Sequence, residues 1–197
     1  MNATPLFGTI LAGGQARRLG GIDKGLVDVG GKPMIEWIIE RLGPQVGTVI
    51  INANRNHDAY ARYGYPVVSD TFGNYAGPLA GFAAAMEHAG RGALLTVPCD
   101  SPAPPPDLAR RLLAAMDDGN AELAVAHDGD RLQPVYALLP VILLDSLRSF
   151  LEAGDRKIDL WYARHRMVTA DFSDHPEAFL NLNRPQDMDR LLASVAL

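Results

Sequence analysis

Cysteine is almost absent from this sequence, since Cys99 is the only one in 197 residues. A single cysteine excludes a disulfide framework within the chain and a zinc site built from cysteines, and it is typical of a reducing compartment such as the cytoplasm. An excess of positive charge is also lacking, because 18 Lys and Arg stand against 23 Asp and Glu and give a net charge of −5. A nonspecific nucleic-acid binder is normally basic, so no nucleic acid is expected as the main partner.

Long hydrophobic runs are lacking as well. The longest, 93–97 and 135–144, are too short to span a membrane or are interrupted by Pro140. The first 14 residues contain no basic region, and their apolar stretch ends at a pair of glycines, so they do not resemble a signal peptide. We therefore expect one domain over 1–197 that is cytoplasmic, mainly monomeric and not bound to a membrane.

What the chain does contain is an alternation of strand-like and helix-like segments. Short apolar runs predict strands, and apolar residues at helical spacing after a proline predict helices. Strands are expected at 7–11, 48–53, 66–68, 93–99 and 123–126, and helices at 33–42, 56–63, 78–89 and 106–116. Uniformly apolar strands separated by helices indicate an α/β fold, with a mostly parallel sheet covered by helices on both faces.

The pattern changes after His127, where a turn at 128–130 precedes a strand that we expect to be antiparallel. We expect that strand at 133–138, helices at 141–151 and 156–165, a last strand at 167–172, and a terminal helix from Pro185. Asp155 is the expected N-cap of the helix at 156–165.

The segment 11–24, with the sequence LAGGQARRLGGIDK, follows the first expected strand. Ligands of parallel α/β sheets bind beyond the carboxyl ends of the strands. Glycines such as Gly13 and Gly14 let backbone N–H groups approach an anion, and Arg17, Arg18 and Lys24 add charge suited to a polyphosphate. The spacing fits neither a Walker A loop nor a dinucleotide fingerprint. The alternative is a strand-to-helix connection whose arginines are simply hydrated.

Two aspartates follow expected strands. Asp100 ends the most apolar strand, and Mg²⁺ binds through one or two carboxylates together with phosphate oxygens and water. The alternative is that Asp100 caps a rigid turn between prolines. Asp70 offers a second carboxylate at the same edge of the sheet, which favours the metal site.

The segment 77–81, with the sequence GPLAG, begins the helix expected at 78–89. The backbone groups of such a turn can bind the edge of a nucleotide base, starting at Gly77, or the turn can be a plain helix start with close packing at Gly81. The sequence leaves both interpretations open. Cys99 has no evident base beside it and is expected to be a small buried residue rather than a nucleophile.

Taken together, these motifs resemble the nucleotidyltransferases, and most closely the molybdenum cofactor guanylyltransferases. The collinear matches span nearly the whole chain and lie at 11–24, 31–33 (GKP), 52–55 (NANR), Asp70, 77–81 (GPLAG), 98–100 (PCD), 133–134 (QP) and 181–185 (NLNRP). The resemblance implies a Rossmann-like three-layer nucleotidyltransferase fold. It also implies transfer of GMP from GTP to molybdenum-bound molybdopterin, with release of pyrophosphate.

The resemblance further implies roles for individual residues. Asp100 would hold Mg²⁺, Lys24 would contact the phosphates, and Asn181 with Asn183 would lie on the pterin side. We further assign the stabilisation of the leaving pyrophosphate to Lys24 and Arg18. The residues implied in GTP binding are Leu11, Ala12, Gly13, Lys24, Asn52, Asp70 and Asp100. To these we add Gly14 and Gly77 from the sequence patterns described above. Transient contact with molybdoenzymes or cofactor-delivery proteins is also expected.

Three other functions remain as alternatives. A cytidylyltransferase for the same cofactor would share these motifs, and a sugar-phosphate nucleotidyltransferase would share the glycine-rich segment. A nucleotide-binding regulator without catalysis is the alternative from a different class, although it would not need Lys24, Asp70 and Asp100 together.

Overall fold

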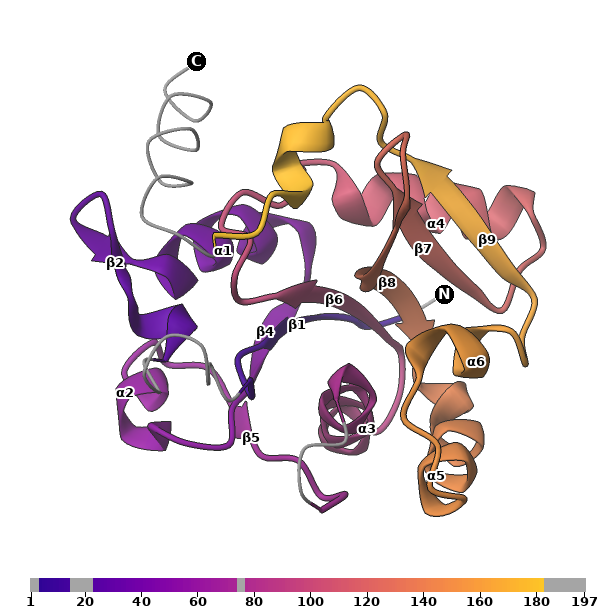
Figure 1. Cartoon of the computed structure of the whole chain (residues 1–197), viewed down its shortest axis with the longest axis horizontal. Coiled ribbons are helices and arrows are strands. Elements are labelled where there is room, and N and C mark those ends of the chain that lie inside the picture. The colour runs from indigo at the N-terminus through magenta and orange to yellow at the C-terminus, as the bar shows by residue number, and fades with distance from the viewer. Residues whose placement is uncertain (1–3, 15–22, 74–76, 183–197) are drawn as a thin grey trace.

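The computed structural model of the chain describes residues 4–14, 23–73 and 77–182. Its centre is a seven-stranded sheet in the order β5-β4-β1-β6-β8-β7-β9, and helices cover both of its faces (Figure 1). The strands are β1 Leu6–Leu11, β4 Thr48–Asn52, β5 Val67–Val68, β6 Ala93–Pro98, β7 Leu123–His127, β8 Leu132–Pro140 and β9 Met167–Asp171.

The sheet is parallel apart from one strand. β1 pairs in parallel with β4 and β6, β4 with β5, and β7 with β9, whereas β8 is antiparallel to both β6 and β7. The mostly parallel sheet and its single antiparallel strand after the turn at 128–130 are both confirmed. Because β1 lies between β4 and β6, the segments that follow these three strands leave the sheet side by side.

Two apolar cores lie on opposite faces of the sheet. One packs α1 and α4 against the sheet through residues such as Ile35 and Leu112, and the other packs α3, α5 and α6 through residues such as Phe82 and Trp161. The helices are α1 Met34–Leu42, α2 His57–Ala61, α3 Pro78–Ala89, α4 Leu108–Asp118, α5 Leu144–Glu152 and α6 Ile158–Tyr162. Burial of apolar side chains on both faces is what holds this three-layer arrangement together.

Short elements that the sequence patterns did not indicate complete the fold. A second, two-stranded sheet joins β2 (Asp28–Val29) to β3 (Lys32–Pro33). Gly30 and Gly31 connect these strands at φ values of +64° and +93°, which side chains rarely allow. The 3-10 helices are η2 Lys24–Leu26, η3 Gly43–Gln45, η4 Val141–Leu143 and η5 Pro176–Phe179.

The expected N-cap at Asp155 is wrong. Helix α6 starts at Ile158, and Lys157 occupies the N-cap position without a side-chain capping bond. Asp155 lies too far upstream to reach the free N–H groups of the helix, and its carboxylate instead approaches Arg164 at 3.7 Å. The helix expected from Pro185 lies outside the described residues. In the described part of the chain, no helix has the length and apolar character needed to cross a membrane.

Candidate active site

The candidate site lies where the carboxyl ends of β1, β4, β5 and β6 meet. The strand register pairs Leu11 with both Asn52 and Pro98, and Asn52 with Val68. The residues that follow these strand ends therefore emerge at one edge of the sheet. Further bonds continue the pairing past the strands, since Ala12 N–H donates to the Asn52 carbonyl at 2.7 Å and Cys99 N–H to the Leu11 carbonyl at 3.1 Å.

Lys24 and Asp100 meet at this edge. Lys24 Nζ donates to Asp100 Oδ2 at 3.1 Å, and the two side chains are 21% and 22% exposed. The end of the glycine-rich segment and the carboxylate after β6 are thus within reach of one small bound molecule. A partly exposed pair of this kind contributes little to stability, so its position is more informative about binding than about folding.

Asp70 organises the two asparagines of the segment 52–55. Its Oδ1 accepts a hydrogen bond from Asn52 Nδ2 at 2.9 Å, and its Oδ2 accepts one from Asn54 Nδ2 at 2.8 Å. Its backbone N–H donates in return to Asn54 Oδ1 at 2.9 Å. Both carboxylate oxygens of Asp70 therefore hold amide side chains in place, which is a different use from the second metal ligand that the sequence suggested.

Glycines allow the closest approaches around Asn52. A Cβ at Gly81 would lie 2.5 Å from Asn52 Oδ1 and 2.8 Å from Leu11 Cδ2. A Cβ at Gly13 would lie 2.8 Å from Asn54 Nδ2 and 3.2 Å from Asn52 Oδ1. The segment after β1 that contains Gly13 and the helix that contains Gly81 can pack around the asparagines only without side chains at these two positions.

Asp23 has a structural role that its place in the segment 11–24 did not indicate. It is 7% exposed and accepts hydrogen bonds from Tyr60 Oη at 2.5 Å and Asn56 Nδ2 at 2.9 Å, while Arg55 Nε lies 3.7 Å away. Burial, followed by the hydrogen bond to Asp23, raises the pKa of Tyr60, so its phenol remains the donor. This network fixes the backbone immediately before Lys24.

The β4–α2 connection also reaches the other side of the glycine-rich segment. Asn54 Nδ2 donates to the Gly13 carbonyl at 3.4 Å, and Arg55 Nη2 donates to the Gly14 carbonyl at 3.5 Å. Residues 54–56 therefore contact the chain on both sides of residues 15–22. Arg18 lies outside the described residues.

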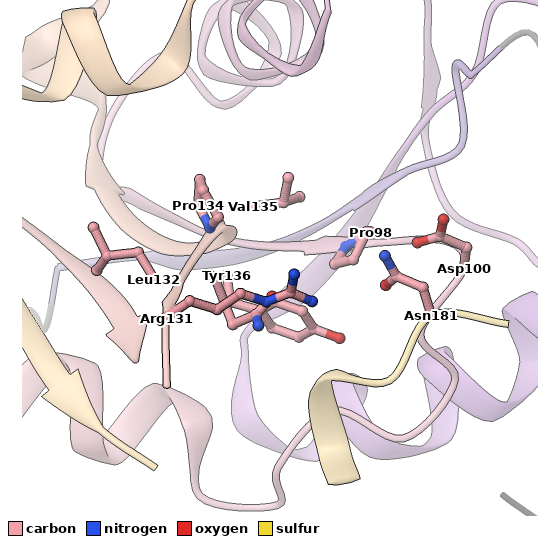
Figure 2. A pocket seen from close by; sticks show the side chains of 9 residues that line it. Pro98, Asp100, Arg131, Leu132, Pro134, Val135, Tyr136 and Asn181 are labelled. Carbon is pink, nitrogen blue, oxygen red and sulfur yellow. The ribbon is translucent and has the colours of Figure 1, made fainter. Parts of the chain in front are cut away.

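A pocket of about 410 Å³ opens on the β8 side of Asp100 (Figure 2). Asp100 and Asn181 stand at one end of it, and Arg131 crosses it from the β7–β8 turn. The remaining lining residues are Pro98, Leu132, Gln133, Pro134, Val135 and Tyr136. Asn181 therefore lies beside Asp100, whereas Asn183 lies outside the described residues.

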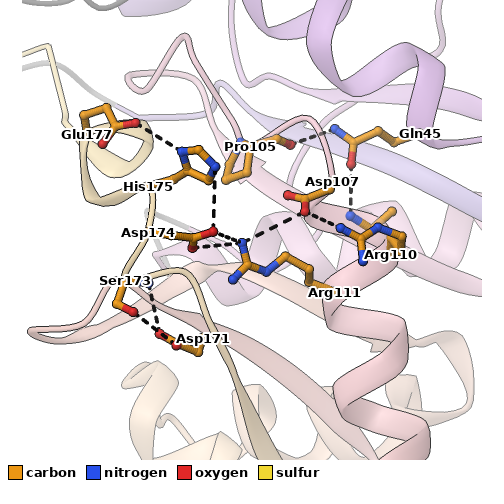
Figure 3. A network of polar contacts seen from close by, with 11 residues as sticks. Gln45, Pro105, Asp107, Arg110, Arg111, Asp171, Ser173, Asp174, His175 and Glu177 are labelled. Carbon is orange, nitrogen blue, oxygen red and sulfur yellow. Dashed lines mark hydrogen bonds and ion pairs between the residues drawn. The ribbon is translucent and has the colours of Figure 1, made fainter.

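The segment that carries Asn181 is attached to α4 by a polar network (Figure 3). Arg111 Nη1 donates to both oxygens of Asp174, at 2.9 and 3.0 Å, and its guanidinium lies 4.3 Å from the ring centre of Phe172. His175 contacts Asp174 and Glu177 in the same network. These contacts hold residues 172–177 against α4, just before the chain reaches the pocket.

Gly77 lies at the start of α3. It is the N-cap of the helix at φ +72°, a conformation that favours glycine, and the helix begins at Pro78 as predicted.

Cys99 is buried, and burial raises the pKa of its thiol to about 12. A thiol that keeps its proton at neutral pH is a poor nucleophile, which agrees with the structural role expected for it.

The side chains around Asp100 suit a metal cation that is coordinated mainly by atoms of a bound small molecule and by water. Within the described ranges, no group of three or more His, Cys, Asp or Glu side chains comes together to hold a metal ion. Asp100 is partly exposed, and its hydrogen bond with Lys24 uses Oδ2. One carboxylate beside an open pocket fits Mg²⁺, which takes one or two carboxylates and completes its shell with phosphate oxygens and water.

Known proteins are similar to this chain over most of its length. Residues 8–168 match the family model described as the MobA-like NTP transferase domain. Two relatives, from Shewanella sp. (strain ANA-3) and Shewanella loihica, both bear the name molybdenum cofactor guanylyltransferase. The first is 55% identical over 94% of each chain, and the second is 52% identical over 95% of each.

Solved structures share the fold. The molybdopterin-guanine dinucleotide biosynthesis protein A of Archaeoglobus fulgidus is similar with a TM-score of 0.77, at 23% identity over 96% of this chain and 98% of its own. A CMP:2-keto-3-deoxy-manno-octonic acid synthetase complexed with CTP has a TM-score of 0.72, at 13% identity over 98% and 99% of the two chains. The same architecture therefore serves different nucleotides, and the fold alone does not select the base.

Proposed function

Since the chain belongs to the MobA-like NTP transferase family, we propose that it transfers GMP from GTP to molybdenum-bound molybdopterin, forming the guanine dinucleotide cofactor and releasing pyrophosphate. The names of relatives that share more than half of its residues over nearly its whole length support this reaction. The structural observation that carries the proposal is the contact of Lys24 with Asp100, where the strands that bear the nucleotide motifs end.

We assign GTP to the β1–β4–β5 side of Asp100. Gly13 and Gly14 would face the phosphates with their backbone N–H groups, and Asn52, held by Asp70, would face the nucleoside. Gly77, at the start of α3, would offer backbone groups to the base edge. Leu11 and Ala12 complete this side, because they lie at the end of β1 between Asn52 and Pro98.

We assign the acceptor to the pocket on the opposite side of Asp100. Asn181 lines this pocket, and Asn183 belongs to the same motif. A volume of about 410 Å³ suits a small molecule, and the Arg131 side chain that crosses the pocket suits an anionic one. The two substrates would then meet at Asp100, which in-line transfer at the α-phosphorus requires.

The chemistry needs charge neutralisation and alignment rather than a strong base. The terminal phosphate of molybdopterin is already anionic at neutral pH, so no group has to remove a proton from it. Asp100 would hold Mg²⁺ together with phosphate oxygens, and the bound ion would neutralise the two reacting anions. Lys24, Arg18 and the backbone amides of the glycine-rich segment would stabilise the departing pyrophosphate.

One assay separates this function from the cytidylyltransferase and the regulatory alternative. The protein is incubated with Mg²⁺, molybdenum-bound molybdopterin and GTP, CTP or ATP in turn, and the release of pyrophosphate is measured. We expect turnover with GTP. Turnover with CTP instead would identify a cytidylyltransferase, and nucleotide binding without turnover would favour the regulatory alternative.

The proposal extends to compartment and partners. The one cysteine is a buried free thiol, which is compatible with a reducing cytoplasm. We propose a mainly monomeric enzyme that contacts a molybdoenzyme or a cofactor-delivery protein only transiently. Size-exclusion chromatography with light scattering tests the monomer, since a stable dimer would appear at twice the mass of the chain.

A further inference from the structure

Ser101 follows Asp100 directly, yet it does not line the pocket. It is fully buried, and its hydroxyl donates to Asn181 Oδ1 at 2.6 Å. The backbone reinforces this contact, because Leu182 N–H donates to the Asp100 carbonyl at 2.7 Å. Two bonds therefore join the segment after β6 to the segment that carries Asn181, although 80 positions separate Ser101 from Asn181.

The hydrogen bond from Ser101 determines which end of the Asn181 amide remains for a ligand. A primary amide has an oxygen that accepts and a nitrogen that donates two hydrogen bonds. Since Oδ1 is bonded to Ser101, Nδ2 is the end left to donate. Figure 2 shows Asn181 reaching from its own segment toward Pro98 and Asp100, at the pocket end where the acceptor would approach the nucleotide.

Ser101 also lies beside a buried tyrosine, Tyr136. Tyr136 Oη can itself donate to the Ala178 carbonyl at 3.4 Å. The Asn181 residue is exposed, so without Ser101 its amide would be free to turn in water.

We propose that Ser101 is a positioning residue for the acceptor: it holds Asn181 so that the amide N–H₂ donates to an anionic oxygen of the acceptor beside Asp100. This inference rests on the proposed function and adds a residue and a ligand group to it. Arg131 on the same pocket supplies positive charge of the kind that an anionic acceptor requires.

A double-mutant cycle tests the proposal, with Ser101→Ala, Asn181→Ala and the double variant. We expect Ser101→Ala to raise the KM for molybdopterin about 10-fold, the size of one lost hydrogen bond to a charged group, with the KM for GTP unchanged. In the Asn181→Ala background, Ser101→Ala should add nothing, because its effect passes through Asn181. Ser149→Ala is the control, because its hydroxyl also makes one bond, to the Asp145 carbonyl on the exposed face of α5, and it should leave both KM values unchanged.

A third variant tests the orientation of the amide. Asn181→Asp replaces the donating N–H₂ with a carboxylate oxygen, so molybdopterin binding should weaken at least as much as in Asn181→Ala. Near-normal binding by Asn181→Asp would overturn the orientation. An acceptor KM within twofold of the wild type in Ser101→Ala, or an equal effect of Ser101→Ala in both backgrounds, would overturn the positioning role.

Direct binding of molybdopterin without GTP separates this inference from the reaction itself. If the wild type binds molybdopterin but releases no pyrophosphate with any nucleotide, the proposed transfer is wrong, and the affinities of the variants still decide the role of Ser101. If the wild type does not bind molybdopterin, the acceptor pocket and the role of Ser101 are both wrong.

Discussion

Lys24 and Asp100 are separated by 76 positions, and Lys24 Nζ lies 3.1 Å from Asp100 Oδ2. One ends the glycine-rich segment after β1, and the other follows β6, which pairs with β1 in parallel. The parallel pairing brings the two charges to the same edge of the sheet. In the proposed function these two charges would meet the triphosphate and its cation, which makes this pair the first to test.

Removing either member of this pair should slow the reaction without unfolding the protein. We expect Asp100→Ala and Lys24→Ala to lower kcat about 10²–10³-fold, the usual cost of losing one group that stabilises developing charge. Circular dichroism and thermal unfolding should remain near wild type, because both side chains are partly exposed. Glu40→Ala is the control, since it breaks the exposed ion pair with Lys32 and should leave kcat unchanged. Near-normal turnover by either site variant would show that its assigned role is wrong.

Asp70 should act through the asparagines that it holds. Asp70→Ala removes the closer acceptor of Asn52 Nδ2 and of Asn54 Nδ2 and leaves them their longer bonds of 3.4 Å to the Val68 and Gly13 carbonyls, so both amides are held less firmly. We expect the KM for GTP to rise about 10-fold, on the scale of one or two hydrogen bonds, with the KM for molybdopterin unchanged. If instead Asp70→Ala abolished Mg²⁺ dependence and left the KM for GTP unchanged, Asp70 would be a metal ligand.

Gly81 should tolerate no side chain. Alanine would normally favour a helix by about 1 kcal/mol over glycine, but a Cβ here would lie 2.5 Å from Asn52 Oδ1. We expect Gly81→Ala to weaken GTP binding more than 10-fold in calorimetry, because Asn52 must move. Gly43→Ala is the matched control, since nothing lies within 4 Å of its Cβ position and its φ is −51°. Equal GTP affinity in the two variants would contradict the close packing inferred around Asn52.

Tyr60 should contribute to both stability and catalysis. Tyr60→Phe leaves the buried Asp23 carboxylate without its shortest hydrogen bond, which should lower the free energy of unfolding by about 1–3 kcal/mol in urea denaturation. The same loss loosens the chain before Lys24, so kcat should fall even at temperatures where the variant is folded. Tyr65→Phe, on the half-buried stretch after α2, should change neither quantity. A fully active Tyr60→Phe would limit the Asp23 network to stability.

Alkaline pH should destabilise the fold. Burial raises the pKa of the Cys99 thiol to about 12 and also raises those of Tyr60, Tyr136 and Tyr162. The folded state therefore binds these protons more tightly than the unfolded chain, so their contribution is complete below about pH 9 and is lost as the pH rises further. Urea denaturation at about pH 7.5 and about pH 10.5 measures this loss.

Because Cys99 is buried and its thiol keeps its proton, iodoacetamide should label Cys99 only after unfolding. Rapid labelling of the native protein would contradict its burial.

Local sequence patterns determined most of the secondary structure. The proline at 78, which lacks the N–H that a helix start leaves free, and the glycine at 90, at φ +67°, delimit α3 as predicted. The apolar run at β6 indicated a buried parallel strand, and the turn at 128–130 indicated the reversal into β8. Each of these features depends on residues close together in the chain, so periodicity and turn chemistry were sufficient to find it.

The roles of several side chains were decided only by the tertiary structure. The sequence motifs named Asp70 and Asp100 as carboxylates at one edge, but only the fold gave both oxygens of Asp70 to asparagines and brought Lys24 to Asp100. The bond of Tyr60 to Asp23 and that of Ser101 to Asn181 span 37 and 80 positions, and nothing in the local sequence of either partner indicates the other. Helix and strand preferences are local energies, whereas these pairs depend on the order in which distant strands join the sheet, and that order exists only after the chain has folded.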